Sequence, residues 1–278
     1  MGFENLLYRQ MEQGTFEQFE EYCRNLVKAD PRYGDVFLYA MALADEVSHS
    51  YFKDQVMLIG GFGVLGHMID VEGPEVVKYW RGSHDLDIAC QNHQALAYVL
   101  NQFAREEHQS LSLPDKKTVK LVDSSIEEIV GRSSICDADI YYPTDKRNKE
   151  KIRVGNKQLQ AKDFEGALEV DVYNTTFKIH DEYGLLSMKL GVVTSENLPR
   201  PKDIIDIFNL LGVCERRKQS AAEVYSTLSD EERMKLMEIF HYSPQSNNRY
   251  VLLAPSPGFI NELEDLFKSE KSPSVVNM

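Results

Sequence analysis

Two aspartates placed two positions apart are the residues of this sequence best suited to chemistry. Asp85 and Asp87 stand in the segment 81–88, RGSHDLDI, where acids and apolar residues alternate as they do in a β-strand. Side chains two apart on a strand point to the same face, so both carboxylates would lie side by side. Mg²⁺ typically binds through one or two carboxylates together with substrate phosphates. The segment therefore predicts a magnesium and phosphate site.

Glycine turns adjoin this segment at two places. Gly60 and Gly61 follow the apolar run VMLI at 56–59, which predicts a buried strand that ends in a tight turn. A glycine pair lets a triphosphate lie against the backbone, and Ser83 offers a hydroxyl and an amide to its terminal oxygens. We expect Gly60, Gly61, Gly82 and Ser83 to bind the phosphates of a nucleotide.

The same glycines permit a different interpretation. Residues 61–66, GFGVLG, form a literal G-x-G-x-x-G, the fingerprint of a Rossmann dinucleotide site, with Asp85 and Asp87 in place of the ribose-binding acid. However, the preceding segment 78–84, KYWRGSH, is typical of a turn, whereas the fingerprint needs an apolar strand that ends in the acid. No succession of further βαβ units follows. We therefore regard a Rossmann-type oxidoreductase as the weaker alternative.

Composition limits the partners. The chain has 278 residues, with 44 Asp and Glu against 31 Lys and Arg, and a formal charge of −13. This charge argues against a broad basic surface for nucleic acid, which needs many contacts from Lys and Arg to phosphate, and leaves room only for a local patch. The four cysteines form no C-x-x-C pair, which predicts reduced, buried thiols. We expect a cytoplasmic protein with no membrane partner, because no signal peptide and no apolar run of about 20 residues is present.

The order of the patterns predicts an α+β fold. We expect a helical N-terminal extension over 1–50, an α/β core with a mixed sheet and flanking helices over 51–180, and a helical C-terminal region over 181–278. The predicted strands are 56–59, 85–90, 119–122, 135–142 and 167–173, and residues 108–117 are predicted to be a loop. The predicted helices are 3–28, 36–50, 64–69, 92–107, 182–194, 201–217, 219–227, 229–240 and 257–269.

The glycine pair followed by R-x-S-x-D-L-D-I resembles the nucleotidyltransferase superfamily, which has the polymerase-β-like fold. A second block, YGLLSMKL at 183–190 and RPKDIIDI at 200–207, is similar to the helical L-x-x-K-L … R/K-D-x-x-D-L/I segment of the AbiEii-type toxins of type IV toxin–antitoxin systems. The resemblance covers about residues 55–212, although the interval between the glycine pair and the aspartates is longer than is usual. It implies a nucleotidyltransferase-type mixed sheet, one or two Mg²⁺ ions and a nucleoside triphosphate as substrate.

The resemblance also implies a third carboxylate from a neighbouring strand, and two segments could supply it. Asp137 and Asp139 alternate correctly in ICDADIY at 135–141, and Glu169 and Asp171 do so in LEVDVY at 168–173. Asp139 stands where the family commonly carries an acid, and Asp171 remains the alternative. Such a group could complete the metal coordination or accept the proton of an attacking hydroxyl.

Lys189 and two acids on the following helix are the last candidates. The family block would make Lys189 a point charge on phosphate oxygens, while a lysine among leucines can equally extend to solvent. Asp203 and Asp206 share a helix face, so one of them could orient Lys189 or a metal-bound water. His67 and His84 flank the site in sequence, but we assign neither of them as a ligand.

Two classes of function follow from these residues. The first is a Mg²⁺-dependent transferase that moves a nucleoside monophosphate to a hydroxyl of RNA, protein or a small molecule, and the resemblance adds a toxin role with an antitoxin protein as partner. The second is a nucleotide-binding or interaction module of the same fold without turnover, because a fold does not determine an activity.

Overall fold

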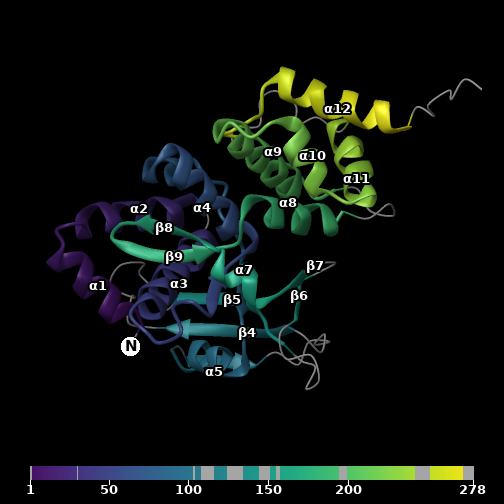
Figure 1. The fold of residues 1–278 in the computed structure, drawn as a ribbon. Helices are drawn as coiled ribbons and strands as arrows, with labels where there is room; N and C mark the ends of the chain where they lie inside the picture. Colours follow the sequence, from purple (N-terminus) through teal and green to yellow (C-terminus); the bar gives the residue numbers. More distant parts are fainter. Residues whose placement is uncertain are drawn as a thin grey trace, which may run out of the picture. The chain divides into compact units, whose positions relative to one another are not determined.

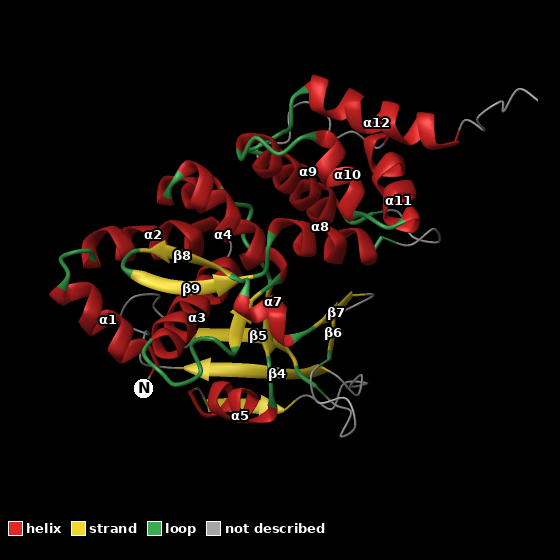
Figure 2. Ribbon diagram, viewed as in Figure 1, coloured by secondary structure: helices red, strands yellow, loops and turns green. Residues whose placement is uncertain are grey.

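The computed structural model describes residues 2–29, 31–102, 104–107, 116–123, 134–143, 151–154, 157–193, 199–241 and 251–271. It divides into two compact units, Met1–Asp181 and Glu182–Met278. The first unit holds a mixed sheet with helices, whereas the described part of the second is built from helices (Figures 1 and 2). The predicted α+β class, with helices flanking a mixed sheet, is thereby confirmed.

A seven-stranded mixed sheet forms the centre of the first unit, in the order β3-β4-β5-β2-β1-β9-β8. The pairs β1–β2, β3–β4, β4–β5 and β8–β9 are antiparallel, and the pairs β2–β5 and β1–β9 are parallel. A separate two-stranded ribbon pairs β6 (Ile152–Val154) with β7 (Lys157–Leu159). The strands of the large sheet are β1 (Val56–Leu58), β2 (Asp85–Cys90), β3 (Ala104–Glu107), β4 (Lys116–Asp123), β5 (Ser134–Tyr141), β8 (Leu168–Val172) and β9 (Thr175–Ile179).

The N-terminal helices belong to the packing of this sheet. Helix α3 contacts β9, β5 and β2 of the sheet and is flanked by α1 and α2. The Phe37 ring of α3 lies 6.3 Å from the ring of Phe19 in α2 and 6.0 Å from that of Phe62 in α4. The structure thus places the first 50 residues inside the first unit. Its helices are α1 (Gly2–Glu12), α2 (Phe16–Ala29), α3 (Pro31–Ser48), α4 (Gly60–Glu72), η1 (Pro74–Tyr79), α5 (His93–Gln102) and α7 (Ala161–Glu165).

Several boundaries differ from those that the sequence predicts. The single helix predicted over 3–28 is two helices, α1 and α2; α4 begins at Gly60 and not at 64; and β9 was not predicted. Two further differences concern the edge of the sheet. The helix predicted over 92–107 ends at Gln102, and the following Ala104–Glu107 is an edge strand that pairs with β4. Strand β4 itself begins at Lys116, inside a segment predicted to be loop. Both segments are charged and carry no apolar alternation, so their strand structure comes from cross-strand pairing rather than from local pattern.

The second unit consists, in its described part, of five helices that match the predicted positions. Their bounds are α8 (Glu182–Gly191), α9 (Pro201–Arg216), α10 (Ala221–Thr227), α11 (Asp230–His241) and α12 (Pro257–Lys271). Asn209 of α9 accepts hydrogen bonds from the backbone N–H groups of Leu252 and Leu253, at 2.9 and 3.1 Å. This pair of bonds ties the segment before α12 to α9.

Neither the cysteines nor the helices of the described residues suggest a disulfide or a membrane span. All four cysteines are free and buried. None of the described helices combines the length and the apolar run that crossing a bilayer would require.

Candidate functional site

Strand register gathers four aspartates on one face of the sheet. In the parallel pair β2–β5, Asp85 lies opposite Asp137 and Asp87 lies opposite Asp139. Residues directly opposite in a ladder share a face, so the four carboxylates form two adjacent rows. Leu86 lies between Asp85 and Asp87 and pairs with Ala138 of β5, and both residues are buried on the other face of the sheet. The alternation of acidic and apolar residues that the sequence predicts for β2 is therefore present, and the neighbouring strand β5 has the same alternation.

The glycine turn lies directly against this carboxylate face. Gly60 begins α4 with a φ of +62°, a conformation that favours glycine. A Cβ atom at this position would lie 2.0 Å from Oδ2 of Asp87, inside the carboxylate group. The backbone N–H of Ile59 donates to the carbonyl of Asp87 at 3.0 Å and holds the two segments together. Gly60 is thus required both by its backbone conformation and by the side chain that it faces.

Residues of the segment before β2 also lie against the glycine turn, at Gly61. A Cβ atom on Gly61 would lie 3.1 Å from Oγ of Ser83 and 3.2 Å from Nη2 of Arg81. Ser83 is buried, and its hydroxyl donates to Oδ1 of Asp85 at 3.2 Å. The guanidinium of Arg81 donates to the carbonyl of Gly82 at 2.6 Å. The residues predicted to bind phosphate therefore lie together with the aspartate pair.

Tyr33, near the start of α3, packs against the segment that precedes β2. Gly82 has a φ of +76°, and a Cβ atom there would lie 2.2 Å from the ring of Tyr33. The Tyr33 ring stacks on His84, with ring centroids 5.1 Å apart. Gly82 is therefore a place where only a glycine allows the aromatic ring to approach the backbone.

Asp139 is held by two side chains of strand β4. Its Oδ2 lies 2.8 Å from Nζ of Lys116, and its Oδ1 accepts from the hydroxyl of Thr118 at 2.6 Å. Thr118 lies directly opposite Asp139 in the ladder, and Lys120 lies opposite Asp137. Strand β4 thus brings cationic side chains to the face that carries the four aspartates.

The pKa of the Cys136 thiol responds to a buried carboxylate on α3, in addition to the aspartates on β2 and β5. Burial raises the pKa of this thiol well above its usual value, and the negative charge of Asp137 raises it further. Asp35, Asp85 and Asp87 act in the same direction. Asp35 belongs to α3 and is 1% exposed. The signal in the sequence was an acid at the start of the apolar run VFLYAMALA, at 36–44.

Asp171 lies elsewhere. Its strand β8 is separated from β2 by β1 and β9, which puts the two strands about 14 Å apart at about 4.8 Å per strand. Its carboxylate is exposed and accepts a hydrogen bond from the hydroxyl of Thr176. The structure therefore does not bring Asp171 to the aspartate pair.

Lys189 and its two acids form a buried ion cluster in the second unit. The Nζ atom of Lys189 lies 2.6 Å from Oδ2 of Asp206 and 3.6 Å from Oδ1 of Asp203. Both aspartates are 1% exposed, and Lys189 is 9% exposed. Arg200 reaches Oδ2 of Asp203 from the exposed side, at 2.5 Å. These distances allow Asp203 and Asp206 to orient Lys189, as the sequence predicts, within the second unit.

The two histidines near the motifs have other partners. The ring of His67 is fully buried in α4, and its Nε2 lies 2.8 Å from the backbone carbonyl of His180. His84 stacks on Tyr33. These contacts give both rings a structural role.

The glycine-rich run 61–66 forms the first turns of α4 itself, and Gly66 packs on Ile179 and Phe177 of β9. In a Rossmann unit, the strands before and after this helix are parallel neighbours. Here β1 and β2 are antiparallel. This topology is incompatible with the dinucleotide-binding interpretation.

The aspartate pair fits Mg²⁺ in one binding mode. Among the described residues, no group of three or more His, Cys, Asp or Glu side chains is arranged to hold a metal ion. Mg²⁺, however, commonly binds through one or two carboxylates and completes its shell with water and phosphate oxygens. Asp85 and Asp87, beside a turn that a Cβ would fill, offer that donor set.

Comparisons with known proteins assign the chain to no family. No family profile matches the sequence, and no curated protein does. An antigenic nucleotidyltransferase-like protein from Paracoccidioides brasiliensis is similar in structure, with 11% identity over 74% of this chain and 88% of that one, at a TM-score of 0.39. JHP933 from Helicobacter pylori is similar with 14% identity over 84% of this chain and 93% of that one, at a TM-score of 0.41. What the fold and the site define by themselves is an α+β unit that carries paired carboxylates beside a glycine turn.

Proposed function

We propose that the chain is a Mg²⁺-dependent nucleotidyltransferase that moves a nucleoside monophosphate from a nucleoside triphosphate to a hydroxyl acceptor. The observation that supports this most is the contact of Gly60 with the Asp87 carboxylate. This contact brings the backbone of the glycine turn directly against two carboxylates that lie on one strand face. Neither the glycine turn nor the aspartate pair would need the other if each were merely structural.

Each residue has a place in this reaction. Asp85 and Asp87 would hold Mg²⁺, which when bound supplies positive charge to the phosphate oxygens. The backbone at Gly60 and Gly61, with Ser83, would bind the triphosphate. The acceptor oxygen attacks the α-phosphorus, the bond between the α-phosphorus and its bridging oxygen breaks, pyrophosphate leaves, and a carboxylate takes the proton of the hydroxyl.

Strand β5 is our choice for the third carboxylate. Asp139 lies opposite Asp87 and Asp137 lies opposite Asp85, whereas Asp171 is three strands away. Lys116 and Thr118 already engage both oxygens of Asp139, which favours a positioning role for it. Asp137 is the exposed member of the pair and is the better candidate for the proton acceptor.

The acceptor and the partners are proposed from the resemblance. We propose RNA or protein as acceptor, an antitoxin protein as partner, and a cytoplasmic location. Within the second unit, Asp203 and Asp206 would hold Lys189 as a fixed positive charge of the kind that binds phosphate oxygens.

A module without turnover is the second candidate, and one observation favours it. Asp139 is neutralised by Lys116, so the site has one carboxylate less for catalysis than four aspartates in two rows suggest. Such a site would bind a nucleotide with Mg²⁺ and release it unchanged.

Two measurements separate these functions. The four nucleoside triphosphates, labelled at the α-phosphate, are incubated with Mg²⁺, the chain, and tRNA, protein or small hydroxyl acceptors, and transferred label is counted. Nucleotide binding is measured in parallel by titration calorimetry. We expect Asp85→Asn/Asp87→Asn to abolish both, while Asp70→Asn/Glu72→Gln, which removes two exposed acids with the same spacing on α4, leaves them unchanged. Transfer that survives in the first variant contradicts the site, and binding without transfer to any acceptor supports the module.

A further inference from the structure

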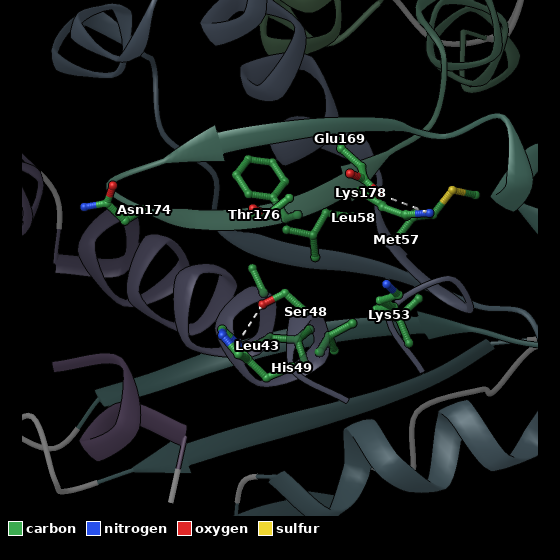
Figure 3. Close-up of a pocket in the computed structure, with 14 residues that line it drawn as sticks. Leu43, Ser48, His49, Lys53, Met57, Leu58, Glu169, Asn174, Thr176 and Lys178 are labelled. Atoms are coloured by element: carbon green, nitrogen blue, oxygen red, sulfur yellow. Dashed lines mark hydrogen bonds and ion pairs between the residues drawn. The ribbon is translucent and has the colours of Figure 1, made fainter. Parts of the chain in front are cut away.

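A cavity of about 310 Å³ opens in the first unit where β1 and β9 separate. These parallel strands are paired at Leu58 and Ile179, near their C-terminal ends. The cavity is lined by all of β1 and by residues 176–178 of β9, and Figure 3 labels Met57, Leu58, Thr176 and Lys178 among them. The turn at Gly60 contributes nothing to the lining. The cavity is therefore separate from the proposed nucleotide site.

Apolar side chains removed from water by the fold form part of the cavity wall, and polar and charged side chains form the rest. Leu43 and Val47 of α3 form one wall, and Met57 and Leu58 of β1 form another. Their exposed fractions are 7% or less. Sites for small molecules are typically cavities of about 300–1,000 Å³ that are lined mainly by apolar groups. The size and the walls therefore suit the apolar part of a small ligand.

Two lysines supply positive charge at one end. In the view of Figure 3, the side chains of Lys53 and Lys178 enter from the same side of the cavity, and Asn174 enters from the opposite side. Lys178 is 13% exposed, and its Nζ lies 2.5 Å from Asp54 and 3.5 Å from Glu169. The hydrogen bond from Lys178 lowers the pKa of Asp54. The ammonium group of Lys178 thus lies between two carboxylates at this end of the cavity.

The acids that hold Lys178 are themselves solvated. Asp54 is 60% exposed and Glu169 is 62% exposed. Ion pairs with exposed partners contribute little free energy, so a ligand anion inside the cavity can share Lys178 at small cost. The same two acids repel any anion in the cavity, and they repel a doubly charged group more strongly than a singly charged one. Among anions, these acids therefore favour a monoanion over a dianion.

We propose that this cavity binds a small amphipathic monoanion, an alkyl or aryl carboxylate. Its carboxylate contacts Lys53 and Lys178, and its apolar part lies between Val47 of α3 and Met57 of β1. The proposal stands apart from the nucleotidyltransferase activity, because the two sites share no residue.

Octanoate is the probe, with 1-octanol and octylamine as its neutral and cationic counterparts. The full chain is labelled with [13C]methyl-methionine, and each compound is titrated while the methyl resonances are recorded. Met57→Leu assigns the Met57 resonance among the nine methionines. We expect octanoate to shift this resonance and to bind at least about tenfold more tightly than 1-octanol, with octylamine weakest.

Variants at the lysines decide the origin of the preference. Lys53→Gln/Lys178→Gln is expected to bring octanoate to the affinity of 1-octanol, and the exposed Lys53→Gln alone gives a smaller loss in a chain with unchanged folding. Lys162→Gln, which removes an exposed lysine of α7, leaves the preference intact. Equal affinity for all three compounds, binding that leaves Met57 unshifted, or no binding at millimolar concentration would each overturn the proposal.

Discussion

Replacing Gly60 by alanine tests whether the glycine turn positions Asp87. The new Cβ would meet Oδ2 of Asp87 at 2.0 Å and its Cγ at 2.8 Å, so the carboxylate must move by at least about 1 Å to reach an ordinary contact. The backbone φ of +62° adds about 1–2 kcal/mol of conformational cost. Overpacking adds about 1–3 kcal/mol. We expect the free energy of unfolding to fall by about 2–5 kcal/mol in total.

The same displacement should suppress activity more than binding. A misplacement of about 1 Å in a catalytic constellation can reduce the rate by about a hundredfold. We therefore expect Gly60→Ala to lower label transfer, or Mg²⁺-dependent nucleotide binding if there is no turnover, by about a hundredfold. The free energy of unfolding is measured by urea titration. Label transfer is measured without urea, at a temperature at which the variant is folded.

Gly73→Ala is the matched control. Gly73 has a φ of +82°, and a Cβ there meets nothing within 4 Å, so this variant carries the backbone cost without the collision. Because its ψ of 172° lies in a region that is essentially restricted to glycine, this variant should lose about 1–3 kcal/mol of stability and retain full activity. If Gly60→Ala loses no more stability than Gly73→Ala and remains as active, Asp87 is not positioned by the turn and the reasoning fails.

Three further predictions concern single groups. Asp137→Asn should lower label transfer by about a hundredfold or more with little change in nucleotide affinity, as the loss of a general base does. Asp139→Asn should also lower the urea midpoint of unfolding. Equal effects of the two variants on transfer, with no effect on the midpoint, would contradict this division of roles. Lys189→Met should destabilise the second unit by about 3–5 kcal/mol in a thermal or urea transition, because it leaves Asp206 buried without that cation, and Lys189→Met/Asp206→Asn should recover part of the loss. Burial raises the pKa of Tyr173 from 10.0 to about 12. The unfolded chain therefore loses this proton at lower pH than the folded chain, and the free energy of unfolding falls as the pH rises from 10 toward 12. Tyr173→Phe should make this fall less steep in urea unfolding at a series of pH values, and an unchanged slope would refute the assignment.

The local part of the site could be predicted from sequence because strand alternation encodes faces directly. Strand β2 was predicted over 85–90, which are its bounds in the structure, and its two acids lie on one face as the alternation requires. Gly60 and Gly61 were predicted to form a tight turn after the strand 56–59, and in the structure they follow β1 and form the start of α4. Both features depend on residues within a few positions of one another.

The partner strand could not be predicted, because pairing order depends on contacts between distant segments. Strands β5 and β8 both carry acids with the correct alternation, and only the sheet order places β5 beside β2 and β8 beyond β1 and β9. The approach of Tyr33 to Gly82 is a similar case, because 49 positions separate them and no local pattern links a helix start to this turn. Strand β4 was missed at its charged start, where Lys116 makes its ion pair with Asp139.

The charge of the sheet face explains how a chain of net charge −13 can be proposed to bind a triphosphate. Two rows of aspartates on neighbouring strands repel one another, and β4 offsets one member with Lys116 and brings Lys120 opposite another. The pair on β2 lies beyond β5 from this strand, and a metal ion bound at the pair would add positive charge directly beside it. A bound Mg²⁺ would supply that charge, so the affinity for nucleotide should depend on Mg²⁺ far more steeply than on monovalent salt. A site built instead from basic side chains would show the reverse dependence, and the same calorimetric titration at varied Mg²⁺ and varied KCl distinguishes them.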